Sequence, residues 1–221
     1  YAVGGAKDSA IDGWRGVVYR STTGLTWTLD YILPAAQTEL MADKNSELLG
    51  IAFDGTSTLV TVGRGATVSR KNEAGAWSSI STSATSTHAL EDIAYGDGYF
   101  VFVGHKTTPS TNGDVAVYRS TDGQTWEDVS SGSGLDSWQD FREIEFINGA
   151  FHASGHYSRA RGSTDSGQTW TTTQVGNRHT LQGFASIGGL HYAVGLDHDD
   201  SSTDIDLIST DELNWTPVYP G

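Results

Sequence analysis

The sequence contains no cysteine, which excludes disulfide bonds, thiol catalysis and thiolate metal sites. The fold must therefore be held together by its packed core. Prolines are also few, since only 4 are spread among 27 glycines. This composition is typical of turns between short strands and differs from that of a low-complexity linker. For 221 residues we therefore expect one domain without an internal boundary.

Positive charge and long apolar runs are scarce as well. The formal net charge is -14 and no run of lysines and arginines forms a basic patch, so nucleic acid is excluded as a partner. No apolar run approaches the roughly 20 residues of a membrane span. An acidic, lysine-poor surface suits an extracellular or cell-surface setting. Because the chain begins at Tyr1 inside a strand-like segment, we expect a removed leader or a fragment.

The sequence does contain an internal repeat. Five segments end in a tryptophan, and these tryptophans are 44 to 50 residues apart. Three of the segments are nearly the same: VYRSTTGLTW, VYRSTDGQTW and RGSTDSGQTW. A period of roughly 40 to 50 residues is typical of the four-stranded blades of β-propellers.

A second part of the repeat precedes each of the last four tryptophan segments. Two apolar runs with period-two alternation flank a glycine turn, as in LEDIAYGDG followed by YFVFVGH. Each blade is thus predicted to contain strands A and B, a variable loop, strand C, the turn and strand D. The first copy starts with YAVGG, which matches strand B, so its inner strand is missing.

The predicted fold class is all-β: a five-bladed β-propeller with turns between strands C and D, its first blade lacking the inner strand. It covers residues 1–221 as a single domain. The expected blades lie at residues 1–33, 46–81, 88–130, 139–174 and 179–221. We expect the ring to close as five blades with one three-stranded blade, or the missing strand to come from upstream sequence or a partner.

The turns that end in tryptophan have a structural explanation. Serine and aspartate side chains can bond to the turn's own backbone, glycine can adopt a positive φ, and the tryptophan can pack beneath. Burying one tryptophan contributes at most about 4 to 6 kcal/mol to the stability of the fold, at roughly 25 cal/mol per Å² of buried surface. We therefore interpret the following residues as structural: Ser120, Asp122, Gly123, Trp126, Ser163, Asp165, Gly167, Trp170, Trp27, Trp77 and Trp215.

The segments STDGQTW and STDSGQTW resemble the Asp-box (BNR) repeat of sialidases and related propellers. The run GDGYFVFVG with VYRSTDGQTW is similar to repeats of bacterial secreted and surface proteins. The resemblance covers essentially the whole chain, although Thr23 replaces the aspartate before Trp27 and the copies at Trp77 and Trp215 match poorly. In that family the box lies opposite the ligand, so the resemblance implies a sialidase-like fold and leaves function open.

A ligand is therefore expected on the face formed by the B-to-C and D-to-A loops. Polar residues gather at the starts of the A strands, where charges near a narrow axis form either a satisfied ion-pair ring or a ligand site. Aromatic residues on that face either stack on sugar rings or cover the loops. The candidate ligand-binding residues are Trp14, Trp138, His88, Glu91, Arg142, Glu143, Arg178 and His179.

The acidic loop LDHDDSSTDID is a candidate calcium site, because calcium takes about six to eight oxygen ligands. The candidate ligands are Asp197, Asp199, Asp200 and Asp204. Their spacing does not match an EF-hand loop. The alternative is an acidic loop exposed to solvent, and no other cofactor is expected.

These features favour a noncatalytic, lectin-like recognition module, secreted or surface-attached, that binds carbohydrate or a protein partner through the loop face. One alternative is a structural subunit of a larger extracellular assembly. Another is a sialidase-like glycoside hydrolase, which would need an arginine cluster from Arg15, Arg142 and Arg178 beside Glu91 or Glu143. No arginine motif of that family is present, and its six-bladed architecture is longer than this chain.

Overall fold

The computed structural model describes residues 1–39, 44–84, 87–106, 115–131, 135, 141–155, 159–174, 179–188, 190–197, 204–209 and 216–218. These residues form an all-β protein of five small antiparallel sheets, consistent with the blades of a β-propeller. The described residues also include one short helix, α1 (Ala35–Glu39), which follows Pro34.

Each sheet is built from strands that follow one another in the sequence. The first sheet contains β1 (Ala2–Asp8), β2 (Gly13–Arg20) and β3 (Thr28–Ile32). The second contains β4 (Leu48–Phe53), β5 (Leu59–Gly63), β6 (Thr67–Lys71) and β7 (Trp77–Ile80). The third contains β8 (His88–Gly96), β9 (Tyr99–Lys106), β10 (Val115–Ser120) and β11 (Glu127–Asp128).

The fourth sheet contains β12 (Phe141–Ile147), β13 (Ala150–Gly155), β14 (Arg159–Ser163) and β15 (Thr171–Gln174). The fifth contains β16 (His179–Ile187), β17 (Leu190–Asp197), β18 (Asp204–Ser209) and β19 (Thr216–Val218). The prediction of four four-stranded sheets and one three-stranded sheet is therefore confirmed for the described residues.

The missing strand of the first sheet is the inner one, as predicted. Val3 of β1 pairs with Val18 of β2 in the way that Val103 of β9 pairs with Val117 of β10. The strand β1 therefore corresponds to the second strand of the other sheets. Nothing in the first sheet corresponds to the first strands β4, β8, β12 and β16.

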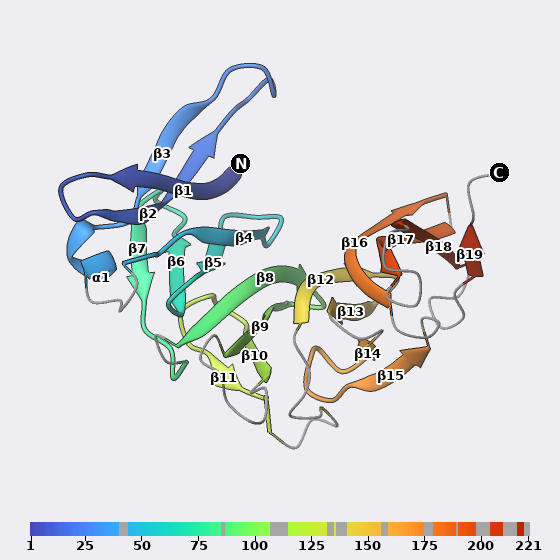
Figure 1. Cartoon of the computed structure of the whole chain (residues 1–221). Helices are drawn as coiled ribbons and strands as arrows, with labels where there is room; N and C mark the ends of the chain where they lie inside the picture. Colours follow the sequence, from blue (N-terminus) through green and yellow to red (C-terminus); the bar gives the residue numbers. More distant parts are fainter. Residues whose placement is uncertain are drawn as a thin grey trace.

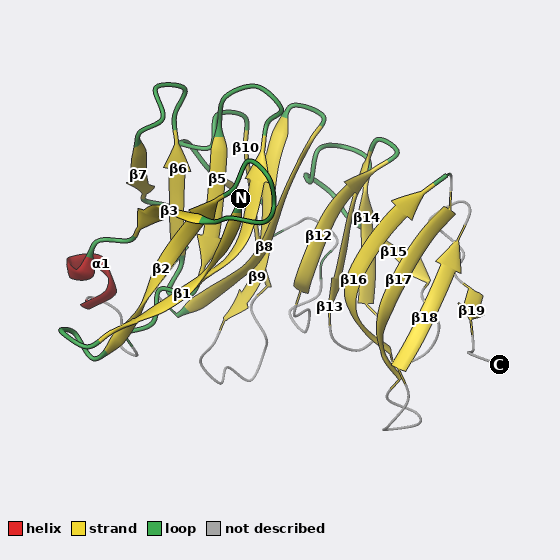
Figure 2. Cartoon of the chain, turned by 90° about the horizontal axis from the view of Figure 1, so that it is seen from above, coloured by secondary structure: helices red, strands yellow, loops and turns green. Residues whose placement is uncertain are grey.

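The five sheets follow one another along an arc, with the first and fifth sheets at its two ends (Figure 1). The view in Figure 2 shows the sheets side by side, with α1 beside the first two. Each sheet packs on the next: β1 on β4, β4 on β8, β8 on β12 and β12 on β16. None of the main packing contacts between described strands joins the first sheet to the fifth. The closing contact of a five-bladed ring is therefore not among the main contacts of the described strands.

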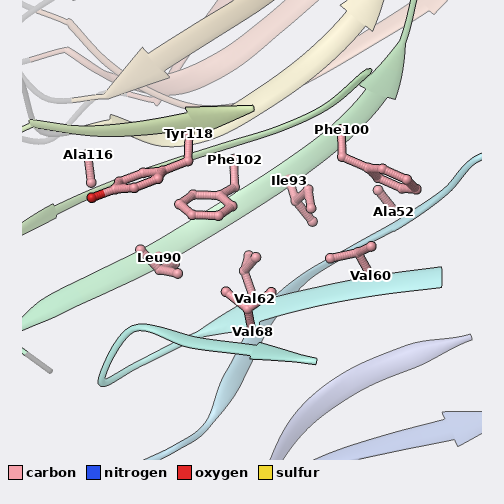
Figure 3. Close-up of a cluster of buried hydrophobic side chains, with 10 residues drawn as sticks. All are labelled: Ala52, Val60, Val62, Val68, Leu90, Ile93, Phe100, Phe102, Ala116 and Tyr118. Atoms are coloured by element: carbon pink, nitrogen blue, oxygen red, sulfur yellow. The ribbon is translucent and has the colours of Figure 1, made fainter. Parts of the chain in front are cut away.

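The core lies between neighbouring sheets, because both faces of each inner sheet are covered. In the third sheet Phe100 and Phe102 face the second sheet, whereas Val101 and Val103 face the fourth. This alternation is the period-two pattern of a strand. The cluster between the second and third sheets is shown in Figure 3. It contains Ala52, Val60, Val62, Val68, Leu90, Ile93, Phe100, Phe102, Ala116 and Tyr118.

Within the described part of the chain, no helix has the length and hydropathy needed to cross a membrane.

Candidate functional site

The turns before the last strand of the first four sheets are held by short polar side chains, and we call them the Ser–Asp turns (residues 21–27, 72–77, 120–126 and 163–170). Serine and aspartate hold the turns of the third and fourth sheets, as expected, whereas Ser21 and Thr23 hold that of the first sheet and Asn72 holds that of the second. The backbone N–H of Gly123 donates to Ser120 Oγ at 2.9 Å. Ser120 in turn donates to Asp122 Oδ1, which also accepts the N–H of Thr125. These bonds hold the pKa of Asp122 below its usual range against the opposing effect of burial. Ser163, Asp165 and Gly167 repeat the arrangement in the fourth sheet.

Two of these turns also dock on the preceding sheet. Arg70 Nε of the second sheet donates to the carbonyl of Asp122 at 2.8 Å. A Cβ at Gly123 would lie 2.6 Å from Cγ2 of Val60, so the turn fits closely against β5. Arg119 Nη1 likewise donates to the carbonyl of Asp165 at 3.5 Å. The end of the sheets that carries the Ser–Asp turns, which we call the turn end, is therefore used for structure.

The tryptophans that close the turns differ in burial. Trp170 is buried and donates to the carbonyl of Gly167, and Trp126 packs beside the second and third sheets. Trp77 stacks on Tyr31 of the first sheet and donates to Asp30. Trp27 has no preceding sheet in this structure to cover it and is 44% exposed. Trp215 lies outside the described residues.

The first strands carry two partly buried carboxylates at matching bulges. The register of β8 shifts between Leu90 and Asp92, and that of β12 shifts between Phe141 and Glu143. Asp92 Oδ2 accepts the N–H of Ile144 in the next sheet at 3.0 Å. Glu143 accepts the N–H of Phe184 in the sheet after that. Each carboxylate therefore links its sheet to the following one, which gives Glu143 a structural role that the sequence did not indicate.

Burial changes the acidity of both carboxyls. It raises the pKa of Asp92 to about 6, although the N–H groups of Ile144 and Ile93 favour the carboxylate. Burial, followed by the negative charge of Asp92, raises the pKa of Glu143 to about 7. Burial also raises the pKa of Glu145, and His191 opposes that shift. The inner strands thus hold acidic groups whose charged form is disfavoured by desolvation.

Glu91 and Arg142 form an ion pair between the third and fourth sheets. Arg142 Nη1 lies 3.0 Å from Glu91 Oε1, and His105 Nδ1 lies 3.4 Å from the same oxygen. The Glu91 side chain is mostly buried. The sequence allows either an ion-pair ring or a ligand site at the starts of these strands. The contacts of Glu91 agree with the ion-pair interpretation, because a mostly buried carboxylate needs a cationic partner.

A hollow of about 420 Å³ opens at the loop end, the end opposite the Ser–Asp turns. It lies where the segment after β7 meets the third sheet. Its lining combines short polar side chains with an apolar pair, and the lining residues are Ser83, His88, Val115, Tyr118, Asp128, Ser130, Ser131 and Leu135. Of the predicted ligand-binding residues, the structure places His88 in this hollow.

Tyr118 connects the hollow to the core. Its ring stacks on Phe102 with centroids 4.9 Å apart, and its hydroxyl accepts a bond from Ser83 Oγ at 3.4 Å. Asp128 lies opposite Tyr118 in the register of β10 and β11. Burial, with a further contribution from the charge of Asp128, raises the pKa of Tyr118. The hydroxyl is thus a neutral, rigidly placed hydrogen-bonding group.

A smaller hollow of about 160 Å³ occupies the matching position one junction earlier. It is lined by Leu33, Gln37, Gly65, Ala66, Thr67, Val68, Ser79 and Ile80. By register, Ser79 stands where Asp128 stands in the third sheet. Ser79 donates to Gln37 Oε1 of α1 at 2.7 Å. The two hollows therefore lie at matching junctions and differ in size and charge.

The remaining predicted residues are dispersed. Trp14 is exposed in the first sheet, where its backbone bonds to residues 44 and 46. His179 begins β16 and pairs in register with Asp197, and Asp204 pairs with Leu196 at the start of β18. Trp138, Arg178, Asp199 and Asp200 lie outside the described residues. In the described part of the chain no three acidic or histidine side chains are grouped as a metal site, and calcium binding stays a prediction.

Sequence reasoning missed most of the hollow. The sequence indicates Tyr118 only as part of the repeated strand, and it carries no signal for Asp128 or Ser83. Tyr118 and Ser83 are 35 residues apart, so only the packing of one sheet on the next brings them together. The signal that could have been used is the alternation of β10, which places Tyr118 on the face toward the second sheet.

No family model matches the chain, and no curated protein matches it. Among solved structures, YCF48 bound to D1 peptide is similar with a TM-score of 0.56 and 18% identity, over 77% of this chain and 53% of that chain. An ancestral GH74 enzyme has a TM-score of 0.64 and 15% identity, over 95% of this chain and 28% of that one. The GH74 enzyme of Niastella koreensis has a TM-score of 0.54 and 16% identity, over 96% of this chain and 29% of that one. The chain thus spans about half of YCF48, and its structure is similar to β-propeller proteins at low sequence identity.

Proposed function

We propose that this protein is a noncatalytic recognition module, secreted or surface-attached, that binds a carbohydrate through the loop-end hollow between the second and third sheets. In this proposal the five sheets are propeller blades and the Ser–Asp turns are Asp-box turns. The observation that carries the proposal is the hollow itself, with its hydroxyls and carboxylate at the end of the molecule not used by those turns.

The chemistry of the lining supports a ligand rich in hydroxyl groups. Ser83, Ser131 and the Tyr118 hydroxyl offer neutral donors and acceptors, and Asp128 offers a carboxylate acceptor. Val115 and Leu135 provide a small apolar contact of the kind that covers the C–H face of a sugar ring. A pocket with a few placed polar groups beside an apolar surface is typical of small-ligand sites.

The arrangement of the described arginines favours binding over sialidase-type catalysis. Arg15 lies in the first sheet, where Nη1 is 2.9 Å from Asp8 Oδ2 and Nε donates to the carbonyl of Leu33. Arg142 is paired with Glu91 between the third and fourth sheets. The two guanidinium groups are therefore engaged at separate places, whereas carboxylate recognition by a sialidase-like enzyme would need them together.

The proposal is tested on an array of oligosaccharides with the full chain and three variants. Asp128→Ala and Tyr118→Phe should each weaken binding to the recognised glycan by about tenfold or more, since each removes a hydrogen-bonding group from the hollow. Ser79→Ala, which changes the matching position of the smaller hollow, is the control and should bind as the parent does. Equal melting temperatures would show that the variants are folded. Absence of any bound glycan, or binding that the two substitutions leave unchanged, would refute the proposal.

A protein partner is the second candidate function, and the presence of two matching hollows on adjacent junctions favours it. A peptide chain laid across the loop end would contact both hollows, whereas a single small sugar would occupy one. The structurally similar YCF48 has been solved bound to a peptide. In this case Ser79→Ala and Asp128→Ala would both weaken capture of the partner from the native source, and their double variant would weaken it further.

A further inference from the structure

One carboxylate distinguishes the larger loop-end hollow from the smaller one. Asp128 lies at the end of β11, directly opposite Tyr118 of β10, and residues opposite each other in adjacent strands point to the same face of the sheet. Both residues line the larger hollow. The matching residue of the smaller hollow is Ser79, which is neutral and bonded to Gln37. The larger hollow therefore carries a negative charge that the smaller hollow lacks.

The carboxylate of Asp128 is held in place by its neighbours. Its Oδ1 accepts the N–H of Ser130 at 2.9 Å, and Ser130 Oγ donates to the carbonyl of Val117 at 3.3 Å. Among the ion pairs of the described residues, none includes Asp128. None of the described residues that line the hollow is a lysine or an arginine, and the net charge of the chain is -14. The hollow and the molecule around it therefore favour a cationic ligand over an anionic one.

The groups beside Asp128 suit a primary ammonium group. A protonated amine has three N–H donors and needs acceptors for them. The carboxylate is one acceptor, and the hydroxyls of Tyr118, Ser83 and Ser131 are further acceptors in the same lining. Burial raises the pKa of Tyr118, and the charge of Asp128 adds to that rise. The negative potential of the carboxylate thus extends to the hydroxyl that connects the hollow to the core.

We propose that the ligand of the larger hollow is a 2-amino sugar, whose unacetylated, protonated amine pairs with Asp128. This inference rests on the carbohydrate-binding function proposed above and specifies its ligand. Charge-assisted hydrogen bonds are stronger than neutral ones, so the amine is favoured over an acetamide or a hydroxyl at the same carbon. A sugar that carries a carboxylate is disfavoured, because it would place a like charge beside Asp128.

The test compares four methyl glycosides that share one glucose ring: the glucosaminide, the N-acetylglucosaminide, the glucoside and the glucuronide. The same four derivatives of galactose remove any dependence on the configuration of the ring. Affinities for the full chain are measured by NMR titration at low ionic strength, in mildly acidic buffer that keeps the amine protonated. The amine should bind about fivefold or more tightly than the acetamide and the hydroxyl, and the uronide should bind most weakly. Added salt should reduce the preference for the amine.

Three variants assign the preference to the carboxylate. Asp128→Asn retains an acceptor for the N–H of Ser130 and removes the charge. It should weaken binding of the amine by about fivefold or more and strengthen binding of the uronide. Asp128→Glu retains the charge and should retain the order of the four affinities. Glu73→Gln is the matched control, since it removes one negative charge from an exposed position in a Ser–Asp turn, and it should bind all four glycosides as the parent does.

The outcomes separate this inference from the function on which it rests. If the amine, acetamide and hydroxyl glycosides bound equally and Asp128→Ala weakened all three, the hollow would bind carbohydrate and the amino-sugar inference would be wrong. A preference for the amine that persisted in Asp128→Asn would also overturn it.

If the single sugars bind too weakly to measure, the same comparison is made on the oligosaccharide array, between glycans that differ only in the acetylation of one hexosamine. The unacetylated member of each bound pair should give the stronger signal with the parent and lose this advantage with Asp128→Asn. An array without any bound glycan would refute the carbohydrate-binding function, and the amino-sugar inference with it.

Discussion

At the scale of single residues, the partly buried carboxylates of the first strands are the least expected feature. Asp92 and Glu143 occupy the same bulge position in successive sheets, and each bonds to a backbone N–H of the next sheet. The second and fifth sheets have glycine at this position, Gly50 and Gly183. A Cβ at Gly50 would lie 2.9 Å from Cα of Asp92, so neighbouring first strands approach closely at the bulge. The bulge position therefore holds either a glycine or a carboxylate that accepts an N–H of the next sheet.

Asp92 should make stability decrease as pH rises through the mildly acidic range. Its pKa is about 6 in the folded protein and about 3.9 in an unfolded chain. Between about pH 4 and pH 6 the folded state therefore binds more protons than the unfolded state, and the free energy of unfolding falls as pH rises. Asp92→Asn removes this dependence and retains an acceptor for Ile144. The variant should gain about 1 to 3 kcal/mol relative to the parent between pH 4 and pH 7.

Denaturant unfolding of both proteins across this pH range measures the difference directly. Asp54 supplies the control, because its pKa is lowered to about 2 by the N–H groups of Thr58, Thr56 and Ser57 against the effect of burial. The contribution of Asp54 to stability is present above about pH 4 and is lost as pH falls through 2. Asp54→Asn should therefore leave the pH dependence of the free energy of unfolding between pH 4 and pH 7 as it is in the parent. A parent and an Asp92→Asn variant with parallel pH profiles would contradict the role given to Asp92.

At the scale of elements, the same Ser–Asp turn is found in two surroundings. Gly24 and Gly123 both have a positive φ, of 76° and 68°. A Cβ at Gly24 would meet nothing within 4 Å, whereas one at Gly123 would meet Val60. The turn of the third sheet is thus docked on a neighbour, and the turn of the first sheet is not.

Alanine at these two glycines separates the cost of backbone conformation from the cost of docking. Gly24→Ala should reduce the free energy of unfolding by about 1 kcal/mol, the cost of a positive φ for a residue with a Cβ. Gly123→Ala should reduce it by about 2 to 4 kcal/mol, because overpacking against Val60 adds to that cost. Chemical denaturation checks both values. Equal losses at the two positions would mean that the docked turn adjusts without strain.

The strands and turns could be predicted from the sequence because their signals are local. The alternation around Ile93 and Tyr95, and the serine and aspartate beside Gly123, each act within a few residues. The bulge at Asp92 and the hollow around Tyr118 could not be predicted in this way. Both depend on which residues of a neighbouring sheet come within bonding distance, and the repeat period leaves that unspecified. His88 lines the hollow, and the sequence indicates its position at the loop end because it begins a predicted strand.

At the scale of the whole molecule, the arc divides the sheets into inner and end sheets. The inner sheets are packed on both faces, with large clusters at the junctions of the second, third and fourth sheets. The end sheets are packed on one face. Most of the exposed large hydrophobic side chains of the described residues lie in them: Tyr1, Trp14, Tyr19, Leu25, Trp27, Leu29, Ile32, Ile187 and Val194. Matching residues of inner sheets are buried, as with Trp27 and Trp170 or Val194 and Val103.

This division predicts a gradient of local stability along the chain. In arrays where each unit contacts only its neighbours, stability is close to a sum of unit and interface contributions, so an end unit that lacks one interface opens first. Amides of β1–β3 should therefore exchange about tenfold or more faster than those of β8–β10 under native conditions, measured by hydrogen exchange with mass spectrometry. Trp170→Ala, which weakens the junction of the third and fourth sheets, should bring the exchange of β8–β10 closer to that of β1–β3. If all five sheets exchanged at one common rate, the molecule would open as a single cooperative unit, and the end faces would be stabilised by contacts that the arc does not contain.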